Sequence, residues 1–299
     1  MTRGPIIGGS ADANDPAVVL LASYSPDQAT LYFCTATVIA PDVLLTAAHC
    51  VDEANHPSFT FGVFTGPDAN DYTDVAVLAP ELLAVSEVRP HPSYDTAAPF
   101  TADIALVRMA EPLAIEPVAI AWEPLPADIA GREARIVGYG QVEYEQANAA
   151  KYSATTVVAA VDPGDTITVG DEVHRSCIGD SGGPAFVMID GVETLVGVNS
   201  YTDVAGCLDP AHYRRVDQYT SFIAELVDPP APPEGGSGAG GSAAGGDDSG
   251  GGEAADGDDD SEGGCATTRE VPHASFGIAA LLLLGASAVL RRRRPISRA

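Results

Sequence analysis

Short apolar runs separated by turn-forming residues extend through the first three quarters of the chain. Four of these runs, at residues 18–21, 43–45, 104–107 and 195–198, have the length of strands and lie between breakers such as Gly, Pro, Asn and Asp. Short apolar runs in this setting are typical of buried strands. Strands do not alternate with helical stretches, which argues against a parallel sheet. The pattern therefore predicts an all-β fold.

One stretch near the end of this region has a helical period instead. Its apolar residues recur every three or four positions along one side: Val216, Tyr219, Phe222, Ile223 and Leu226. This spacing predicts a single amphipathic helix across residues 216–227. Residues 6–228 are therefore expected to form one β-rich domain that ends in a helix.

The composition changes abruptly after residue 228. Residues 229–264 consist mainly of Pro, Gly, Ser, Ala and Asp, with almost no apolar side chains larger than Ala. Such a segment cannot offset the entropy that it would lose on ordering, so we predict a disordered linker. A flexible chain of this length has an end-to-end distance of about 30 Å.

The last segment, residues 265–299, has the pattern of a membrane anchor. A polar spacer after Cys265 leads to an apolar stretch at 274–290, which four arginines follow at 291–294. A helix of this length spans about 25 Å, the short limit for a bilayer, and the arginines favour a cytoplasmic end. A plain C-terminal anchor is one interpretation. In the other, the Gly-Gly-Cys sequence, the apolar stretch and the arginines resemble the bacterial myxosortase or rhombosortase type of sorting signal. That resemblance implies cleavage near Cys265 by a sorting protease and attachment to the cell surface.

The start of the chain does not match an outward-facing anchor. Residues 1–5 contain no apolar stretch and cannot act as a signal peptide. Because an anchored protein of this kind needs an export signal, our hypothesis is that translation starts further upstream or that the signal was trimmed.

Charge and cysteine content narrow the classes of function. The formal net charge of −27 argues against a nucleic-acid partner, because phosphate binding needs clustered basic residues. None of the five cysteines forms a Cys-x-x-Cys pair, so a zinc or redox motif is not expected. Four of them could form two disulfides, leaving Cys265 alone, which suggests an oxidising compartment. Acidic residues around 68–74 could bind a cation, but we interpret them as a solvated loop and predict no metal or cofactor.

Three short segments carry the residue types that nucleophilic catalysis needs. Serine becomes a good nucleophile when a histidine, supported by a buried carboxylate, takes its proton. His49 follows an apolar run and lies among small residues beside Cys50, and Asp103 opens the run at 104–107. Either alone is commonly structural. The third segment, Gly179-Asp180-Ser181-Gly182-Gly183-Pro184, is more specific, because its glycines let the backbone approach a substrate closely.

In this order, the three segments resemble the trypsin/chymotrypsin family of serine peptidases. The similarity extends from residue 6 to about residue 227. It includes the flanking sequences Ile6-Ile7-Gly8-Gly9, His91-Pro92-Ser93-Tyr94-Asp95 and Gly138-Tyr139-Gly140. The resemblance implies two antiparallel Greek-key β-barrels with the active site between them, and hydrolysis of peptide bonds through an acyl-enzyme.

The resemblance also implies the role of each catalytic residue. His49 would act as general base and then as general acid, Asp103 would hold its tautomer, and Ser181 would attack the carbonyl carbon. The N–H groups of Gly179 and Ser181 would form the oxyanion hole. Disulfides are implied between Cys34 and Cys50 and between Cys177 and Cys207.

Activation by cleavage before Ile6 is a further implication. Ile6 matches the family's activated N-terminus, whose ammonium group pairs with a buried aspartate, here Asp180. Residues 1–5 would then be a short propeptide. Pro5 stands where the family usually has Arg or Lys, so we expect that a different protease activates the chain.

The residues that match the specificity pocket carry no carboxylate on its floor. Arg175 falls at the floor, and the walls would be Ser200, Tyr201, Thr202 and Ala211. A P1 preference for Lys or Arg is therefore not expected. Arg175 could select acidic P1 residues through a charge-assisted pair, or it could turn outward and leave a small apolar pocket for Ala or Val.

The function that we predict is that of an exported serine endopeptidase, anchored to the bacterial surface or secreted after C-terminal processing. Its partners would be protein or peptide substrates, an activating protease, a sorting protease, and the membrane through the C-terminal helix. The alternatives are a catalytically silent binding protein and a surface-display protein on the same fold.

Overall fold

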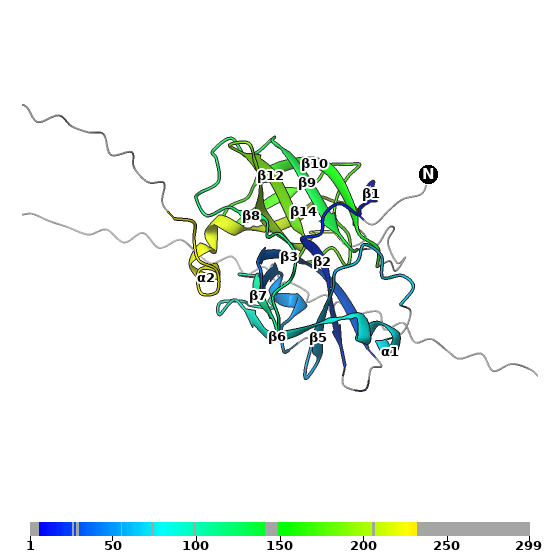
Figure 1. Cartoon of the computed structure of the whole chain (residues 1–299). Coiled ribbons are helices and arrows are strands. Elements are labelled where there is room, and N and C mark those ends of the chain that lie inside the picture. The colour runs from blue at the N-terminus through cyan, green and yellow to red at the C-terminus, as the bar shows by residue number, and fades with distance from the viewer. Residues whose placement is uncertain are drawn as a thin grey trace, which may run out of the picture. The chain divides into compact units, whose positions relative to one another are not determined.

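The computed structural model describes residues 6–231, except 26, 28–29, 55, 73–74, 98–99, 141–148 and 205–206. Within this part, nearly all regular structure is β-strand, arranged in two antiparallel barrels (Figure 1). The prediction of two antiparallel β-barrels is confirmed. The predicted propeptide, most of the linker and the whole segment 265–299, with the apolar stretch 274–290, lie outside the described residues.

The first barrel closes in the order β2-β3-β4-β7-β6-β5, with every neighbouring pair antiparallel. Its strands are β2 (Val18–Tyr24), β3 (Leu31–Ala40), β4 (Val43–Thr46), β5 (Thr60–Phe64), β6 (Leu83–Pro90) and β7 (Ala105–Met109). Three of the four apolar runs of the sequence lie in or next to β2, β4 and β7. They are continuous rather than alternating because both faces of these strands are buried.

The second barrel closes because β9 pairs with both β10 and β12, completing the ring β9-β10-β11-β14-β13-β12. Its strands are β9 (Glu133–Gly138), β10 (Tyr152–Val161), β11 (Thr166–Val169), β12 (Pro184–Ile189), β13 (Val192–Tyr201) and β14 (Ala211–Arg215). Two short strands are added to it: β1 (Ser10–Ala11) is antiparallel to β10, and β8 (Ala119–Ile120) runs parallel to β13. Figure 1 shows this green barrel above the blue and cyan first barrel.

The helices are short, and the predicted helix across residues 216–227 was wrong in extent. The segment forms a 3₁₀ turn, η3 (Val216–Gln218), and one α-helical turn, α2 (Thr220–Ile223). Tyr219 between them has φ −119° and ψ 16°, outside the helical region, so the two turns do not merge. The apolar side was predicted correctly, because Val216, Tyr219, Phe222 and Ile223 are all buried.

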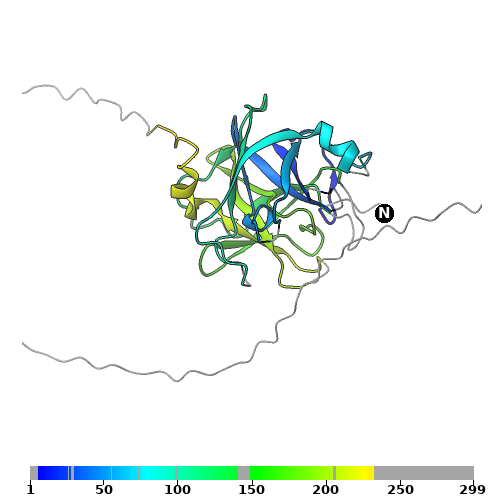
Figure 2. The ribbon, with the colours of Figure 1, turned by 90° about the horizontal axis from the view of Figure 1, so that it is seen from below.

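The other helices are α1 (Val75–Leu78), η1 (Ala48–Cys50) and η2 (Ala79–Glu81). Both views place α1 and α2 at opposite sides of the two-barrel domain (Figures 1 and 2). In the part of the chain that the structure describes, no helix combines the length and the apolar character that crossing a bilayer requires.

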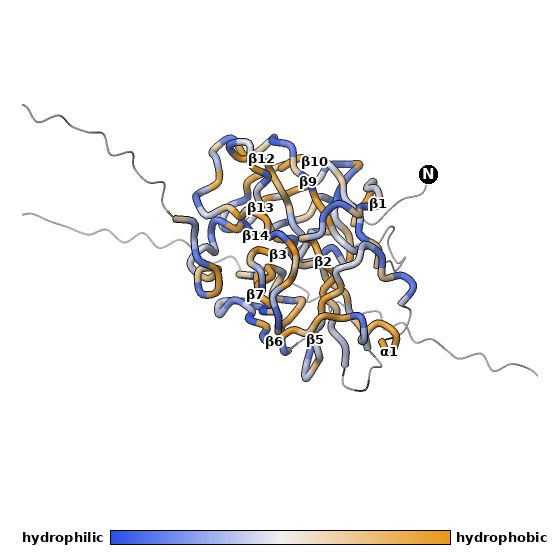
Figure 3. The backbone as a smooth tube through the Cα atoms, in the orientation of Figure 1, coloured by the Kyte–Doolittle hydropathy of each residue, from blue (hydrophilic) through white to orange (hydrophobic). Residues whose placement is uncertain are grey.

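Apolar segments follow the strands of both barrels, whereas the connecting loops are largely polar (Figure 3). Buried hydrogen bonds join the barrels where they meet. The Tyr139 hydroxyl of the second barrel donates to Gly66 O at 2.8 Å, and the buried Lys151 ammonium donates to Val18 O at 3.0 Å. Thr35 N of β3 donates to Ser181 O at 2.8 Å. The last of these bonds holds the Ser181 loop of one barrel against β3 of the other.

Candidate active site

His49 and Asp103 are brought together by the pairing of β4 with β7. Thr46 at the end of β4 lies opposite Ala105 at the start of β7, so the residues just beyond these strand ends meet at one edge of the barrel. His49 lies in the turn η1 that follows β4. Its Nδ1 is 2.8 Å from Asp103 Oδ2, and its backbone N–H donates to Asp103 Oδ1 at 2.9 Å. The carboxylate therefore contacts both the imidazole and the main chain of the histidine.

Asp103 is fully buried but well supplied with donors. The Ser200 hydroxyl donates to Oδ2 at 2.6 Å, in addition to the two bonds from His49. Burial alone would raise the pKa of Asp103, but the charge and hydrogen bonds of His49, together with the Ser200 hydroxyl, hold that pKa below its ordinary value. The carboxylate stays charged and can stabilise a protonated His49.

Ser181 lies in the loop that leads into β12, at the junction of the barrels. The loop is tightly folded, with bonds from Asp180 N to Cys177 O and from Gly183 N to Asp180 O. Gly182 has φ +79°, and a Cβ there would lie 2.1 Å from Thr46 Oγ1 and 2.3 Å from Thr35 O. Only glycine permits this approach, which brings the Ser181 loop to the end of β4, three residues before His49.

The Ser181 hydroxyl is not hydrogen-bonded to the His49 imidazole among the described residues. Catalytic hydrogen bonds are often long or poorly aligned without substrate. The three predicted residues are thus gathered by two separate links: Asp103 bonds His49 directly, and the Ser181 loop packs against the strand that leads to His49.

Gly179 and Ser181 have backbone N–H groups that no described hydrogen bond uses. Gly179 has φ +94°, and a Cβ there would lie 2.8 Å from Gly140 Cα. Its carbonyl accepts from Thr35 Oγ1 at 3.1 Å, which fixes the orientation of the loop. The N–H groups of Gly179 and Ser181 are therefore two fixed and unused donors next to the serine side chain, as stabilisation of an oxyanion requires.

Asp180 is buried beneath this loop with only 1% of its surface exposed. Its carboxylate accepts from the backbone N–H groups of Cys177 and Gly140, each at 2.8 Å, and from that of Ile6. Burial raises the pKa of Asp180 to about 7, although these three bonds oppose the rise. Ile6 itself is fully buried. The structure therefore brings together the two residues expected to form the activation pair.

Both predicted disulfides are present, between Cys34 and Cys50 and between Cys177 and Cys207. The first fixes the turn that carries His49, and the second joins the Ser181 loop to the segment after β13. Cys34, Cys50 and His49 lie close enough to suggest metal ligands. Their sulfurs are bonded to each other, so they are not available to a metal. The two disulfides indicate that the domain folds in an oxidising compartment.

Arg175, expected at the pocket floor, has its guanidinium bonded to main-chain carbonyls. Its Nε donates to Cys207 O at 2.5 Å and its Nη1 donates to Glu172 O at 2.7 Å. Of the expected wall residues, Ser200 bonds Asp103, Tyr201 stacks on His212, and Thr202 Oγ1 donates to Val204 O at 3.3 Å. The fourth, Ala211, is fully buried.

His56 contacts His49, the candidate general base, and sequence reasoning missed it. Its Nε2 lies 3.2 Å from His49 O and its Nδ1 lies 3.2 Å from Ser23 Oγ. A carbonyl only accepts, so Nε2 carries the proton, and burial lowers the pKa of His56. His49 O belongs to a 3₁₀ turn of three residues, where the last carbonyls lack partners within the turn. A single histidine in a polar segment gave no signal of this role.

Comparison with known proteins agrees with this geometry. A model of the trypsin family matches residues 6–223. The chain is 27% identical to chymotrypsin-like elastase family member 1 of Macaca fascicularis, over 76% of this chain and 91% of that protein. It is 26% identical to a tryptase of Mus musculus, over 76% and 90%, and 24% identical to a venom serine protease of Polistes dominula, over 70% and 79%. The chain therefore belongs to the trypsin family and is a serine endopeptidase.

Proposed function

We propose that the enzyme hydrolyses peptide bonds through an acyl-enzyme on Ser181, with His49 as general base and acid and Asp103 as its supporting carboxylate. The observation that carries this assignment is the pair of hydrogen bonds that His49 makes to the Asp103 carboxylate, from Nδ1 at 2.8 Å and from the backbone N–H at 2.9 Å. With Nδ1–H directed to a carboxylate, Nε2 has the free lone pair that removes the serine proton.

In the first step, Ser181 Oγ bonds to the carbonyl carbon as its proton passes to His49 Nε2. The carbonyl oxygen becomes an oxyanion, which the N–H groups of Gly179 and Ser181 would stabilise. The tetrahedral species collapses, the amine leaves with the proton from His49, and the acyl group stays on Ser181. Water then attacks the acyl carbon while His49 takes its proton. His49 returns that proton to Ser181 Oγ as the ester bond breaks and the acid is released.

A fluorophosphonate probe tests this assignment. The processed enzyme should be labelled on Ser181, and Ser181→Ala should not be labelled, while the exposed Ser93→Ala should react like the wild type. Labelling that persists in Ser181→Ala would refute the assignment. Unlabelled wild-type enzyme would favour a catalytically silent binding protein.

For activation, we propose that cleavage before Ile6 creates an ammonium group that pairs with Asp180. The buried position of both residues supports this, because a buried carboxylate without a cation is costly. Blocking the cleavage should leave the enzyme nearly inactive. Full activity of the uncleaved chain would count against the pairing.

For specificity, we propose that the pocket takes a small apolar P1 residue such as Ala or Val. The guanidinium of Arg175 bonds two main-chain carbonyls, which leaves it less able to pair with an acidic side chain. Thr202 and Ala211 stand where glycine is common in the family, and both narrow the opening. The relatives named above include both an elastase family member and a tryptase, so their names do not indicate one P1 preference. The proposal therefore rests on the residues of the pocket.

A P1 library of peptides tests the specificity directly. We expect cleavage after Ala or Val to exceed cleavage after Asp or Glu. A preference for Asp or Glu that is lost in Arg175→Gln would show that the arginine selects acidic residues. A preference for Lys or Arg would refute both interpretations of the pocket.

For location, we propose export and attachment to the bacterial surface through processing at Cys265. The support is the order of linker, Gly-Gly-Cys, apolar stretch and arginines in the sequence. Mass spectrometry of surface proteins should find a C-terminal peptide that ends near Cys265, and Cys265→Ala should abolish it. An intact segment 274–290 in the mature protein would instead indicate a plain membrane anchor.

A further inference from the structure

Asn199 on β13 is a polar residue in a buried position, with only 5% of its surface exposed. Among the described residues, none makes a hydrogen bond to the Asn199 side-chain amide. In the same part of the chain, the amide atoms are not among the fully enclosed polar atoms, so they border a space that a ligand can enter. Buried polar groups in folded proteins nearly always have partners. An unpartnered amide beside an accessible space therefore indicates a bound group that pairs with it.

The backbone of Asn199 lies against the loop that carries Ser181. Its N–H donates to Gly183 O and its carbonyl accepts from Gly182 N, each at 2.8 Å. The next residue along the strand, Ser200, is the first of the expected pocket-wall residues. Asn199 is therefore fixed beside the proposed nucleophile, at the point where the pocket wall begins.

The side chain of Asn199 shares a face of the sheet with residues of the expected pocket. Asn199 lies opposite Tyr213 of β14, and the side chains of directly opposed residues lie on the same face. Ala211, an expected wall residue, is two positions before Tyr213 on β14 and so lies on that face too. The Tyr213 hydroxyl is hydrogen-bonded to Ser176, which adjoins Arg175 at the expected floor. The Asn199 amide therefore faces the pocket between its wall and its floor.

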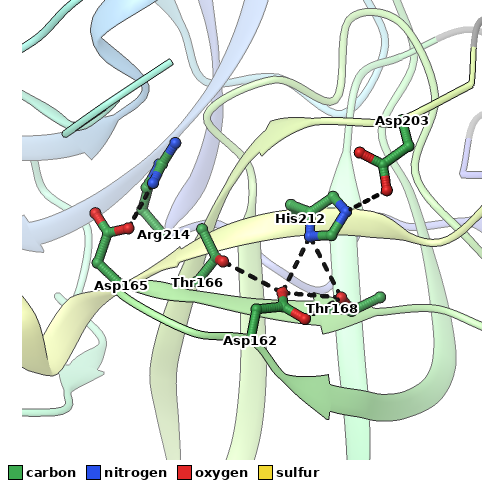
Figure 4. Close-up of polar contacts among 7 residues, drawn as sticks. All are labelled: Asp162, Asp165, Thr166, Thr168, Asp203, His212 and Arg214. Atoms are coloured by element: carbon green, nitrogen blue, oxygen red, sulfur yellow. Dashed lines mark hydrogen bonds and ion pairs between the residues drawn. The ribbon is translucent and has the colours of Figure 1, made fainter. Parts of the chain in front are cut away.

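The polar residues on the opposite face of β14 are paired with carboxylates of their own. His212 Nδ1 lies 3.0 Å from Asp162 Oδ2, and Arg214 Nη1 donates to Asp165 Oδ1 at 2.6 Å (Figure 4). Because successive residues of a strand point to opposite faces, these two side chains lie on the face turned away from the pocket. Neither of them bonds the Asn199 amide, which is left to a side chain that enters the pocket.

Neutral groups line this part of the pocket. They are the Asn199 amide and the hydroxyls of Ser176 and Tyr213, which bond each other. Burial raises the pKa of Tyr213, so its hydroxyl stays neutral. A charged side chain would lose its hydration here and would meet no counter-charge among these three groups, which is costly. An uncharged donor or acceptor is therefore the kind of group that fits.

We propose that Asn199 is a specificity-determining residue that selects a small P1 side chain with a hydroxyl, such as Thr, over an apolar side chain of the same shape, such as Val. The inference rests on the proposed function: it keeps the small size of P1 proposed there and adds a polar group. The amide has two donor hydrogens and an acceptor oxygen, so it can bond a hydroxyl in either direction. A Val side chain in the pocket would exclude water from the amide and leave it unpaired, which costs affinity. A Thr hydroxyl in the same place supplies the missing bond.

Paired substrates test this selection. The processed enzyme is assayed for kcat/KM with two p-nitroanilide peptides that are identical except for Thr or Val at P1. We expect kcat/KM for Thr to exceed that for Val by about 5- to 50-fold in the wild type. In Asn199→Leu, which keeps the side-chain shape but removes the amide, the ratio should fall to about one or below. Thr194→Val, which removes a buried hydroxyl near the start of the same strand, is the matched control and should keep the wild-type ratio.

Urea unfolding in a Ser181→Ala background tests the amide itself without turnover. Because the Asn199 amide has no partner among the described residues, Asn199→Leu should leave the urea midpoint unchanged or raise it. A lower midpoint would overturn the proposal, because the amide would then be bonded within the protein. Equal Thr-to-Val ratios in the wild type and Asn199→Leu, or a wild-type preference for Val, would overturn it as well. Failure of fluorophosphonate labelling in the wild type would refute the proposed function instead, which keeps the two failures distinguishable.

Discussion

Asp180 makes the stability of the uncleaved chain depend on pH in a specific direction. Its pKa of about 7 in the folded state compares with about 3.9 for an ordinary aspartate in an unfolded chain. Between these values the folded state holds a proton that the unfolded state has lost. The free energy of unfolding therefore falls as pH rises through this window. At 1.36 kcal/mol per pKa unit, the total loss is about 4 kcal/mol.

The replacement Asp180→Asn removes this titration and so isolates it. The amide mispairs with one of the N–H donors from Cys177, Gly140 and Ile6, which costs about 1–3 kcal/mol at every pH. The pH dependence, rather than the offset, therefore carries the prediction. Relative to Asp180→Asn, the parent chain, which keeps Asp180, should lose up to about 4 kcal/mol of unfolding free energy between pH 4 and pH 7. Its stability should then level off.

The assay is urea unfolding of the uncleaved chain, in a Ser181→Ala background that prevents self-digestion, at pH steps from 4 to 8. Cleavage before Ile6 should reverse the trend, because the new ammonium group favours the charged carboxylate. Parallel stability curves for the parent and Asp180→Asn would refute this reasoning. They would mean that Asp180 is ionised in the uncleaved chain despite its burial.

Three further changes probe other parts of the site. Replacing His56 by Phe keeps an aromatic ring but removes the donor to His49 O, so kcat should fall by about two- to tenfold with KM unchanged. His56→Gln should recover part of the lost kcat, and equal kcat values for the wild type and both variants would contradict the role. Gly182→Ala forces a Cβ against Thr46, so we expect at least about 3 kcal/mol of destabilisation in urea and loss of labelling, and a stable, active variant would contradict the packing. Removing the Cys34–Cys50 bridge with a double Ser replacement should cost about 3 kcal/mol by the chain-entropy model, and an unchanged urea midpoint would show that the turn holds without it.

The residues of the proposed triad could be identified from the sequence because each follows or precedes a recognisable pattern. His49 comes just after the apolar run that becomes β4, and Asp103 comes just before the run that becomes β7. The antiparallel pairing of these strands then places both at one edge. Ser181 lies in a glycine-rich turn, and the glycines alone indicated a close approach of the backbone. The structure gives the reason at Gly182, which has no room for a side chain.

The features that could not be predicted depend on tertiary contacts between distant segments. His56 meets Ser23, 33 residues earlier, and His212 meets Asp162, 50 residues earlier, and neither spacing has a local pattern. The helix across 216–227 was predicted from its apolar period. In the structure, Asp217 is instead held by bonds from Leu125 N and Arg215, and the backbone leaves the helical region at Tyr219. The apolar period predicted correctly which side of the segment is buried, but local contacts determine its backbone conformation.

The most direct test of the central claim is to trap the acyl-enzyme. The processed enzyme is mixed with a small acyl ester, quenched in acid within one turnover, digested, and analysed by mass spectrometry. We predict that the peptide carrying Ser181 gains the mass of the acyl group, and that Asp103→Asn accumulates this adduct far more slowly. An adduct on another residue, or turnover without any adduct on Ser181, would contradict the mechanism.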